Sequence, residues 1–383
     1  MASSATLEVL ERLIAFNSVS RNSNLDVIDW ARGLLEGSGA STRTSMNAES
    51  TKANLFASWG EGNGGLVLSG HTDVVPVDGQ DWRSDPFRAD IRDGRLYGRG
   101  ACDMKGFVAV AMARAMAMGS SGRDRPLHVA LSYDEEVGCL GIPVLIADLQ
   151  TSGMLPAACL VGEPTSMEVV SAHKGGRLYR CRVRGLAAHS SLAPQAVNAI
   201  EFGARVIGFI QDIADRFRLE GPLDHEFDVA HSTISTNLAS GGNGSNIVPA
   251  GFEFMFEHRF LPGTDSEAPI REITARVERE LLPRMRAVDP EAGISFEPIG
   301  RIPALCVPEQ AAILAHGRAI AGGGPVRKVA YGTEASFFQE AGIDTIVCGP
   351  GSIAQAHRAN EYVELDQLAQ CENFIDRLIA AYA

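Results

Sequence analysis

LVLSGHTDVVP, residues 66–76, is the stretch from which the fold of this 383-residue chain follows. Its first half is a run of apolar residues without polar alternation, which is typical of a strand buried on both faces of a parallel sheet. His71 and Asp73 follow where this strand ends. An imidazole with a carboxylate behind it can act as a metal ligand and the group that orients it. A lone His-X-Asp at a strand end is more often part of a hydrogen-bonded loop, so a metal-binding role for this pair depends on which other residues the chain brings to it.

Strands and helices alternate on both sides of this stretch. Further short strands are predicted near residues 54–59, 127–132 and 157–161, and helices near residues 25–36, 106–118 and 142–149. Asp93-Gly94 lies between two short segments with strand character and predicts a hairpin. The alternation indicates an α/β fold with a mixed, mostly parallel sheet that is flanked by helices and binds ligands at the carboxyl ends of its strands.

From about Arg177 this alternation changes. Strands near residues 177–184, 233–238, 252–260 and 294–298, with helices near 197–217 and 266–285, give the order strand, helix, strand, strand, helix, strand. That order is typical of a ferredoxin-like α+β module. After Arg301 the α/β pattern resumes. We therefore expect one domain from residues 1–176 and 300–383, interrupted by an inserted domain of residues 177–299.

Charge and length narrow the class of protein. The net charge of −13 argues against nucleic acid and anionic membranes as partners. The first 16 residues carry Glu8, Glu11 and Arg12, so they predict an amphipathic helix and not a signal peptide. The longest nearly uncharged stretch contains Arg114 and is too short to span a bilayer. We expect a soluble protein.

The seven cysteines are scattered and include no Cys-X-X-Cys pair. This distribution fits buried or free thiols in a reducing cytoplasm better than a disulfide framework or a thiolate metal site.

Carboxylates and imidazoles follow five of the predicted elements: His71 with Asp73, Asp103, Glu135 with Glu136, Glu163, and His357. At the carboxyl edge of a parallel sheet they can converge. Oxygen and nitrogen ligands without cysteine suit zinc, and also manganese or cobalt. Two imidazoles and three carboxylates are enough for two metal ions if one carboxylate bridges them. Of two adjacent glutamates, one can bind metal while the other serves as a general base; alone, such a pair could be a solvated loop or a helix start.

Five motifs, in this order and spacing, resemble a family of di-zinc hydrolases. They are SGHTDVVP (69–76), YGRGACDMKG (97–106), DEEVG (134–138), VGEPT (161–165) and AHRANEY (356–362). The family includes acetylornithine deacetylase, succinyl-diaminopimelate desuccinylase, aminoacylases and glutamate carboxypeptidases, and the resemblance covers nearly the whole chain. It implies a zinc-peptidase-like catalytic domain with an inserted lid.

The resemblance also implies a ligand set. His71, Asp103 and Glu163 would hold one zinc ion, and Asp103, Glu136 and His357 would hold the other. Asp103 would be the bridge between the two ions.

Further roles follow from the same resemblance. Asp73 would orient His71, and Glu135 would be the general base and proton shuttle. The lid would also form a homodimer, and His189 in GLAAHSS would reach into the partner's active site to stabilise an oxyanion. Alternatively, His189 is a surface histidine at a strand end.

Substrate contacts are implied by similar matches. Asn246 in GSNIVPA and Arg259 in FEHRFLPG would bind a substrate carboxylate, which arginine can do bidentately. Lys174 in HKGG is a further candidate. Each of these residues could instead be a structural cap or part of an ion pair.

YGTEASFF (331–338) and the segment around His357 resemble acetylornithine deacetylase more than the desuccinylase. Gly332 and Thr333 could take an α-carboxylate, while Glu334 could pair with the ammonium of ornithine or, alternatively, cap a helix that begins at Ala335. The expected reaction is hydrolysis of N-acetyl-L-ornithine to L-ornithine and acetate. Hydrolysis of N-succinyl-diaminopimelate, other N-acyl amino acids or dipeptides remains open, as does a non-catalytic dimeric binding protein.

Overall fold

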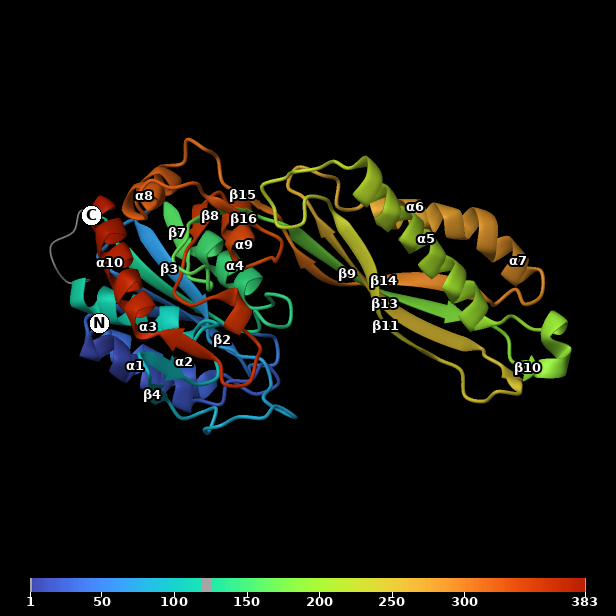
Figure 1. Ribbon diagram of the computed structural model, residues 1–383, viewed down its shortest axis with the longest axis horizontal. Helices are drawn as coiled ribbons and strands as arrows, with labels where there is room; N and C mark the ends of the chain where they lie inside the picture. The colour runs from blue at the N-terminus through green and yellow to red at the C-terminus, as the bar shows by residue number, and fades with distance from the viewer. Residues whose placement is uncertain (1, 119–124, 383) are drawn as a thin grey trace. The chain divides into compact units, whose positions relative to one another are not determined.

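The computed structural model describes residues 2–118 and 125–382, and the chain forms two compact units (Figure 1). Unit 1 consists of Met1–Ala172, Leu305–Lys328 and Thr333–Ala383, and unit 2 of His173–Ala304 and Val329–Gly332. Unit 2 therefore extends beyond the expected residues 177–299 at both ends. It also takes in a short returning segment, residues 329–332, which the sequence pattern did not indicate.

Unit 1 is built on a mixed sheet with the strand order β1-β2-β6-β3-β7-β17-β8-β15, in which β16 also pairs with β8. The strands are β1 (Ser41–Met46), β2 (Ala53–Trp59), β3 (Leu66–His71), β6 (Leu127–Ser132), β7 (Ala158–Val161), β8 (Val170–His173), β15 (Leu305–Cys306), β16 (Arg327–Val329) and β17 (Asp344–Val347). The centre is parallel: β3 runs parallel to β6 and β7, and β17 runs parallel to β7. Every residue of β3 is buried, as its unbroken apolar run predicts.

Helices cover both faces of this sheet. They are α1 (Ser4–Ala15), α2 (Leu25–Gly37), α3 (Lys105–Met118), α4 (Ile142–Ser152), α8 (Ala312–Ile320), α9 (Ala335–Glu340) and α10 (Leu365–Ala381). The central helix α3 is apolar around most of its circumference and packs against α1, α10 and the sheet. The crossovers through α3 and α4 run in opposite directions along the sheet, so right-handed connections place these helices on opposite faces. The expected α/β class is confirmed.

The predicted hairpin is also confirmed, within a separate small sheet. Strands β4 (Asp90–Arg92) and β5 (Arg95–Tyr97) are antiparallel, and Asp93 and Gly94 between them both have positive φ, 50° and 73°. Positive φ at both central residues is the conformation that an Asp-Gly hairpin turn favours. Strand β18 (Tyr362–Glu364), which begins at the last residue of the AHRANEY motif, adds to this sheet beside β5.

Unit 2 contains an antiparallel sheet with the order β11-β13-β9-β14. Its elements are β9 (Gly175–Arg184), α5 (Ala199–Glu220), β11 (Thr233–Gly241), β13 (Gly251–Phe260), α6 (Ala268–Arg276), α7 (Leu282–Arg286) and β14 (Gly293–Ile302). The helices cover one face, over a core that includes Val206, Cys181, Phe254 and Phe256 (Figure 1). Chain order and strand order are those of a ferredoxin-like module.

The long helix expected over residues 266–285 is interrupted. A π-helical turn, Val277–Leu281, separates α6 from α7. Pro283 lies two residues after this turn. Because proline has no amide hydrogen to donate to the preceding turn, it interrupts the regular α-helical ladder.

All seven cysteines lie in the described part of the chain as free thiols, and only Cys306 among them is exposed, which confirms the prediction of buried or free thiols. Over residues 2–118 and 125–382, we find no helix with the length and apolar character needed to cross a membrane.

His128 is an uncharged polar residue inside the unit 1 sheet. It lies in β6, is 3% exposed and stacks on Phe56 with the ring centroids 4.9 Å apart. Its Nε2 donates to the carbonyl oxygen of Gly64 at 3.0 Å, so Nδ1 is the acceptor for the Ser58 hydroxyl at 2.8 Å. Burial lowers the pKa of His128 from 6.5 to about 4, because the charged imidazolium would lose its hydration.

This shift predicts a pH dependence of stability. Above pH 6.5 both folded and unfolded states hold His128 neutral, whereas between pH 6.5 and pH 4 mainly the unfolded state binds the proton. Stability should therefore fall by about 2 kcal/mol between pH 7 and pH 5 from this residue alone. Urea unfolding of the wild type and of His128→Gln at both pH values measures it. Equal losses of stability in the two proteins would contradict the prediction.

Candidate metal centre

The carboxyl edge of the unit 1 sheet gathers the polar residues that the sequence analysis selected. In the parallel register, His71 at the end of β3 lies opposite Ser132 at the end of β6, and Ser69 lies opposite Val161 at the end of β7. The segments after β6 and β7 bring further carboxylates to this edge. Asp103 precedes α3, and His357 follows β17. We call the set the carboxylate–imidazole cluster: His71, Asp103, Glu135, Glu136, Glu163 and His357.

Two groups of possible metal ligands share His71 within this cluster: one with Glu135 and Glu163, the other with Asp103 and Glu136. His71 Nε2 lies 3.2 Å from Asp103 Oδ1 and 3.9 Å from Glu163 Oε1. His357 Nε2 lies 3.0 Å from Glu136 Oε2 and 3.4 Å from Asp103 Oδ2. The two oxygens of Asp103 thus face different imidazoles, as a carboxylate that bridges two ions requires.

The spacing and chemistry of these atoms fit metal ions. At a metal–ligand distance of about 2.0–2.1 Å, the ligand atoms of a tetrahedral site lie about 3.3 Å apart, close to the separations found here. Among the described residues, the buried oxygens Glu136 Oε1 and Glu163 Oε1 have no hydrogen-bond partner. Burial also raises the pKa of Glu163 well above its usual value, and the charge of Asp103 adds to this. A divalent cation would satisfy these oxygens and offset the crowded negative charge.

Asp73 supports this cluster in two ways. His71 Nδ1 lies 2.9 Å from the backbone carbonyl oxygen of Asp73 and 3.6 Å from its carboxylate, which leaves Nε2 as the nitrogen that can bind metal. The carboxylate of Asp73 accepts hydrogen bonds from the Ser20 hydroxyl at 2.7 Å and from the backbone N–H groups of Glu135 at 3.1 Å and Glu136 at 3.3 Å. Asp73 therefore holds the loop with both glutamates. The sequence did not point to Ser20, which is 53 residues away.

Glu135 has the properties of a group that exchanges a proton near neutral pH. Burial raises its pKa to about 8, and the adjacent charge of Glu136 works in the same direction against the opposing effect of His71. The thiol of Cys139 donates to Glu135 Oε1 at 3.4 Å. A carboxyl group with a pKa close to the working pH can both take up and release a proton during a reaction.

Glu334 differs from both expectations for it. It is fully buried, with Oε1 accepting from the Ser69 hydroxyl and Oε2 from the Ser132 hydroxyl, both at 2.6 Å. Within the described residues its side chain makes no capping bond to α9, and the Ala335 N–H instead donates to Thr333 Oγ1 at 3.1 Å. Glu334 therefore fastens β3 and β6 together, and neither the helix cap nor the contact with a substrate ammonium fits this placement.

Unit 2 holds the other candidates, in two places. At one end, His189 is exposed, with Nδ1 2.8 Å from the Ser191 hydroxyl. The N–H of Ser190 donates to the backbone oxygen of Asn246 at 2.9 Å, so His189 and Asn246 lie close together. Asn246 precedes β13, which begins at Gly251, and Arg259 lies near the far end of that strand, about 27 Å from its start. One copy of unit 2 therefore keeps the two side chains apart, so the expected binding of one carboxylate by both would need two copies of the chain.

Arg259 and Lys174 lie at the other end of that sheet. Arg259 Nη2 lies 2.7 Å from Glu257 Oε1, and Lys174 Nζ donates to the backbone oxygen of His231 at 2.5 Å. Burial lowers the pKa of Lys174, and the charge of Arg259 adds to this. Gly332 belongs to unit 2 beside Arg259, whereas Thr333 belongs to unit 1 and is buried. Two neighbouring cations suit an anionic group such as a carboxylate.

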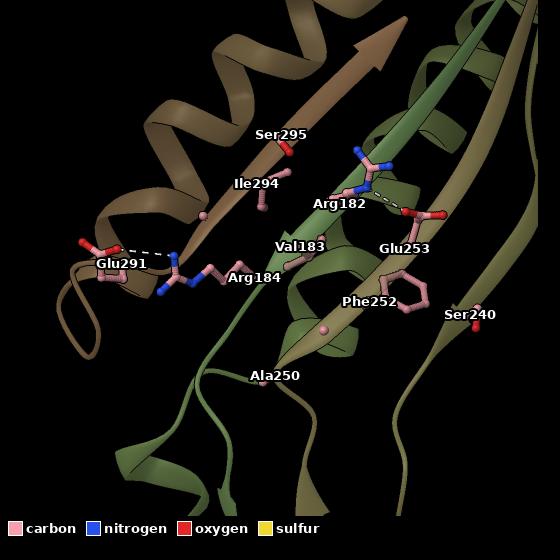
Figure 2. A pocket seen from close by; sticks show the side chains of 12 residues that line it. Arg182, Val183, Arg184, Ser240, Ala250, Phe252, Glu253, Glu291, Ile294 and Ser295 are labelled. Carbon is pink, nitrogen blue, oxygen red and sulfur yellow. Dashed lines mark hydrogen bonds and ion pairs between the residues drawn. The ribbon is translucent and has the colours of Figure 1, made fainter. Parts of the chain in front are cut away.

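A separate open hollow of about 630 Å³ lies on the exposed sheet face of unit 2 (Figure 2). Figure 2 shows its charged side chains paired with one another: Arg182 Nε lies 2.8 Å from Glu253 Oε2, and Arg184 Nη1 lies 3.3 Å from Glu291 Oε2. None of its lining residues belongs to the carboxylate–imidazole cluster. We therefore do not consider it a reaction site.

Known proteins resemble the chain over its full length. Residues 67–381 match the model of peptidase family M20/M25/M40. Acetylornithine deacetylase of Myxococcus xanthus is 32% identical to this chain, over 97% of this chain and 96% of the relative. Acetylornithine deacetylase of Pasteurella multocida (strain Pm70) is 30% identical, over 98% of this chain and 97% of the relative. A Staphylococcus aureus tripeptidase aligns with a TM-score of 0.76 at 17% identity, covering 100% of this chain and 99% of its own. A Bacillus subtilis protein described as a dinuclear metal-binding peptidase of the M20 family aligns with a TM-score of 0.68 at 12% sequence identity. The alignment covers 98% of this chain and 97% of that protein.

The geometry predicts how single substitutions change metal content. Asp103→Ala should lose both ions, because Asp103 offers one oxygen to each half of the cluster. Glu163→Gln and His357→Ala should each lose one. Elemental analysis after equilibrium dialysis against zinc measures bound ions per chain, with circular dichroism to verify folding.

Glu372→Gln is the matched control, since Glu372 accepts hydrogen bonds from Ser3 and Thr6 and belongs to neither ligand group. It should keep two ions. If Asp103→Ala also kept two, the assignment of Asp103 as a bridge would be wrong.

Proposed function

Because the chain belongs to peptidase family M20/M25/M40, we propose that it is an amidohydrolase that converts N-acetyl-L-ornithine to L-ornithine and acetate. The observation that carries the proposal is the placement of the two Asp103 oxygens against two imidazoles beside a general-base candidate, Glu135. Two relatives of nearly equal length named acetylornithine deacetylase support the choice of substrate. We further propose that the reaction serves arginine biosynthesis in the cytoplasm, and the free thiols support a reducing compartment.

In this proposal the site holds two zinc ions, for which cobalt or manganese can substitute. His71, Asp103 and Glu163 would hold one ion, and Asp103, Glu136 and His357 the other. Nitrogen and carboxylate oxygen are suitable ligands for each of these metals. When bound, the ions supply Lewis acidity, which lowers the pKa of water and polarises an acyl carbonyl.

Glu135 carries the proton through the reaction. It takes a proton from the attacking water, whose oxygen bonds to the acyl carbon, and returns it to the nitrogen as the amide C–N bond breaks. The products are acetate and the free amine. Asp73 keeps Glu135 in place through the backbone N–H bond described above.

Arg259 and Lys174 are the proposed anchors for the α-carboxylate of the substrate. Arg259 can bind a carboxylate bidentately, and its side chain is 32% exposed and therefore accessible. Gly332 lies beside Arg259 and has no side chain to obstruct the α-carboxylate, so it is a further candidate for binding that carboxylate. Since both Glu334 oxygens are bonded to serines, the contact that distinguishes ornithine from other amino acids is not assigned to Glu334.

We propose a homodimer formed through unit 2, in which His189 and Asn246 act on the partner's substrate. His189 and Asn246 lie far from Arg259 within one copy of unit 2. This distance supports the proposed dimer, because the three residues could then contact one substrate only if two chains supply them. Strand β11 is an edge of the unit 2 sheet, and its Leu238 is 62% exposed. Exposed edge strands are surfaces on which a second chain can pair. His189 would donate a hydrogen bond to the acyl oxygen as it becomes negative.

The substrate assignment is tested with three N-acyl compounds. The zinc- or cobalt-loaded protein should release acetate from N-acetyl-L-ornithine with a higher kcat/KM than from N-acetyl-L-methionine, and should be least active on N-succinyl-diaminopimelate. Dipeptides belong in the same series. A preference for any of these alternatives would keep the reaction class and overturn the assigned substrate.

Glu135→Gln should bind the same amount of metal as the wild type and lose turnover. The amide cannot accept a proton, so kcat should fall by about 10²–10⁴-fold. Steady-state rates and metal content of the same preparation test this. A variant with full metal and near-normal kcat would remove Glu135 from the role of base.

Mixed dimers test whether His189 acts on the partner's substrate. A dimer of one His189→Ala chain and one Glu135→Gln chain contains one site with both functional groups. After random re-assortment of equal amounts, activity should recover to about a quarter of the wild-type value, although each variant alone is nearly inactive. No recovery, with mixed dimers verified by differential tagging, would contradict the proposed role.

A further inference from the structure

Glu361, in the AHRANEY motif, is a buried carboxylate outside the proposed ligand set. Its side chain is 1% exposed. Oε1 accepts from the backbone N–H groups of Cys102 at 2.8 Å and Asp103 at 3.0 Å. Oε2 accepts from the Gly100 N–H at 3.0 Å and from Arg99 Nη1 at 2.7 Å. Four donors from one loop therefore converge on the two oxygens of Glu361.

Arg99 extends these contacts to the other side of the cluster. Its side chain is 1% exposed, and Nη2 donates to Gln80 Oε1 at 2.5 Å. Gln80 Nε2 in turn donates to the backbone oxygen of His357 at 3.0 Å, and Arg99 Nη1 donates to the backbone oxygen of Arg358 at 3.3 Å. One buried ion pair thus contacts both the loop that carries Asp103 and the segment that carries His357.

The proposed second ion depends on these loops more than the first does. His71 is the last residue of β3 and Glu163 closely follows β7, so neighbouring strands fix two of the three ligands of the first ion, and only Asp103 comes from the loop. His357 lies outside regular secondary structure, its side chain is 56% exposed, and its φ is 64°, in the left-handed region. The position of His357 against Asp103 therefore has to be set by contacts such as those of Glu361 and Arg99.

We propose that Glu361, held by Arg99, is a positioning residue for the second metal ion. It fixes the Asp103 backbone directly and His357 through Arg99 and Gln80, so that both ligands face one ion. This inference rests on the two-metal centre of the proposed function and is independent of the substrate.

The chemistry requires a carboxylate at this position. Ionised glutamate offers two oxygens that both accept, whereas glutamine offers one acceptor oxygen and an NH₂ group that can only donate. In Glu361→Gln, one pair of donors would face the NH₂ group without an acceptor. The loop would then have to rotate, and Asp103 would move with it.

The experiment measures each metal-binding step apart from activity. Metal-stripped wild type and Glu361→Gln are titrated with Co²⁺ or Zn²⁺ by calorimetry, and the visible absorption of Co²⁺ reports the ligand geometry. Substituting groups that support metal ligands typically weakens affinity by about 10–100-fold. We expect this loss at the second ion, which takes both Asp103 and His357 from the affected segments, and a smaller loss at the first ion, which takes only Asp103 from them. The Co²⁺ spectrum should change more at the second step than at the first.

Asp376→Asn is the matched control. Asp376 accepts from Arg114 at 2.6 and 2.7 Å, so its substitution removes a carboxylate–arginine pair of the same unit that lies between α3 and α10. It should leave both steps unchanged. If Glu361→Gln does not fold by circular dichroism, Glu361→Asp replaces it, since the shorter carboxylate keeps the charge but cannot reach all four donors.

The outcomes separate this inference from the proposed function. Two binding steps in Glu361→Gln with wild-type affinities would overturn the positioning role, and so would equal losses at both steps. A wild type that binds a single ion would instead overturn the two-metal centre itself.

Discussion

The parallel pairing of β3 with both β6 and β7 is the constraint on which the rest of the structure depends. Because the three strands run in the same direction and end within two residues of one another in register, the residues that follow them meet at one edge of the sheet. His71, Glu135, Glu136 and Glu163 reach the cluster in this way. Burial of the strands makes the arrangement rigid, since a shift in register would turn apolar side chains of β3 out of their packing. Two of the three ligands of one proposed ion, His71 and Glu163, are thus a direct consequence of a hydrophobic core.

Concentrating buried carboxylates at one edge is unfavourable unless their charge is compensated. The structure meets this cost with fixed hydrogen bonds: Asp73 and Glu361 accept from backbone N–H groups, and both oxygens of Glu334 accept from serine hydroxyls. Burial would raise the pKa of Asp103, but hydrogen bonds from His357 and His71 lower it below its usual value. Glu135 lacks comparable compensation and has its pKa raised to about 8. The carboxyl groups of Asp103 and Glu135 thus differ in pKa because their hydrogen-bond partners differ. Since a bound metal ion would compensate the buried charge, metal binding would be coupled to the stability of unit 1.

The sequence predicted which residues form the cluster, because the position of a residue directly after a buried parallel strand is fixed by the sheet. Contacts between distant segments could not be predicted, since no local pattern links Ser20 to Asp73 or Arg99 and Gln80 to Glu361. Glu334 shows a second limit: the residue was expected near the site, but the direction of its side chain depends on Ser69 and Ser132. These two serines were a usable signal, as polar residues inside apolar strands. Asn246 and Arg259 show a third limit, because motif resemblance carries no information about which copy of a chain supplies a side chain.

We propose that Asp103 joins two metal ions at this edge of the sheet. Anomalous diffraction at the zinc edge, from crystals of the zinc-loaded protein, tests it most directly. We expect two peaks about 3.5–4 Å apart. The first should lie within bonding distance of His71 and Glu163, the second of Glu136 and His357, and both of Asp103. A single peak, or two peaks that do not share Asp103, would show that Asp103 does not bridge two ions.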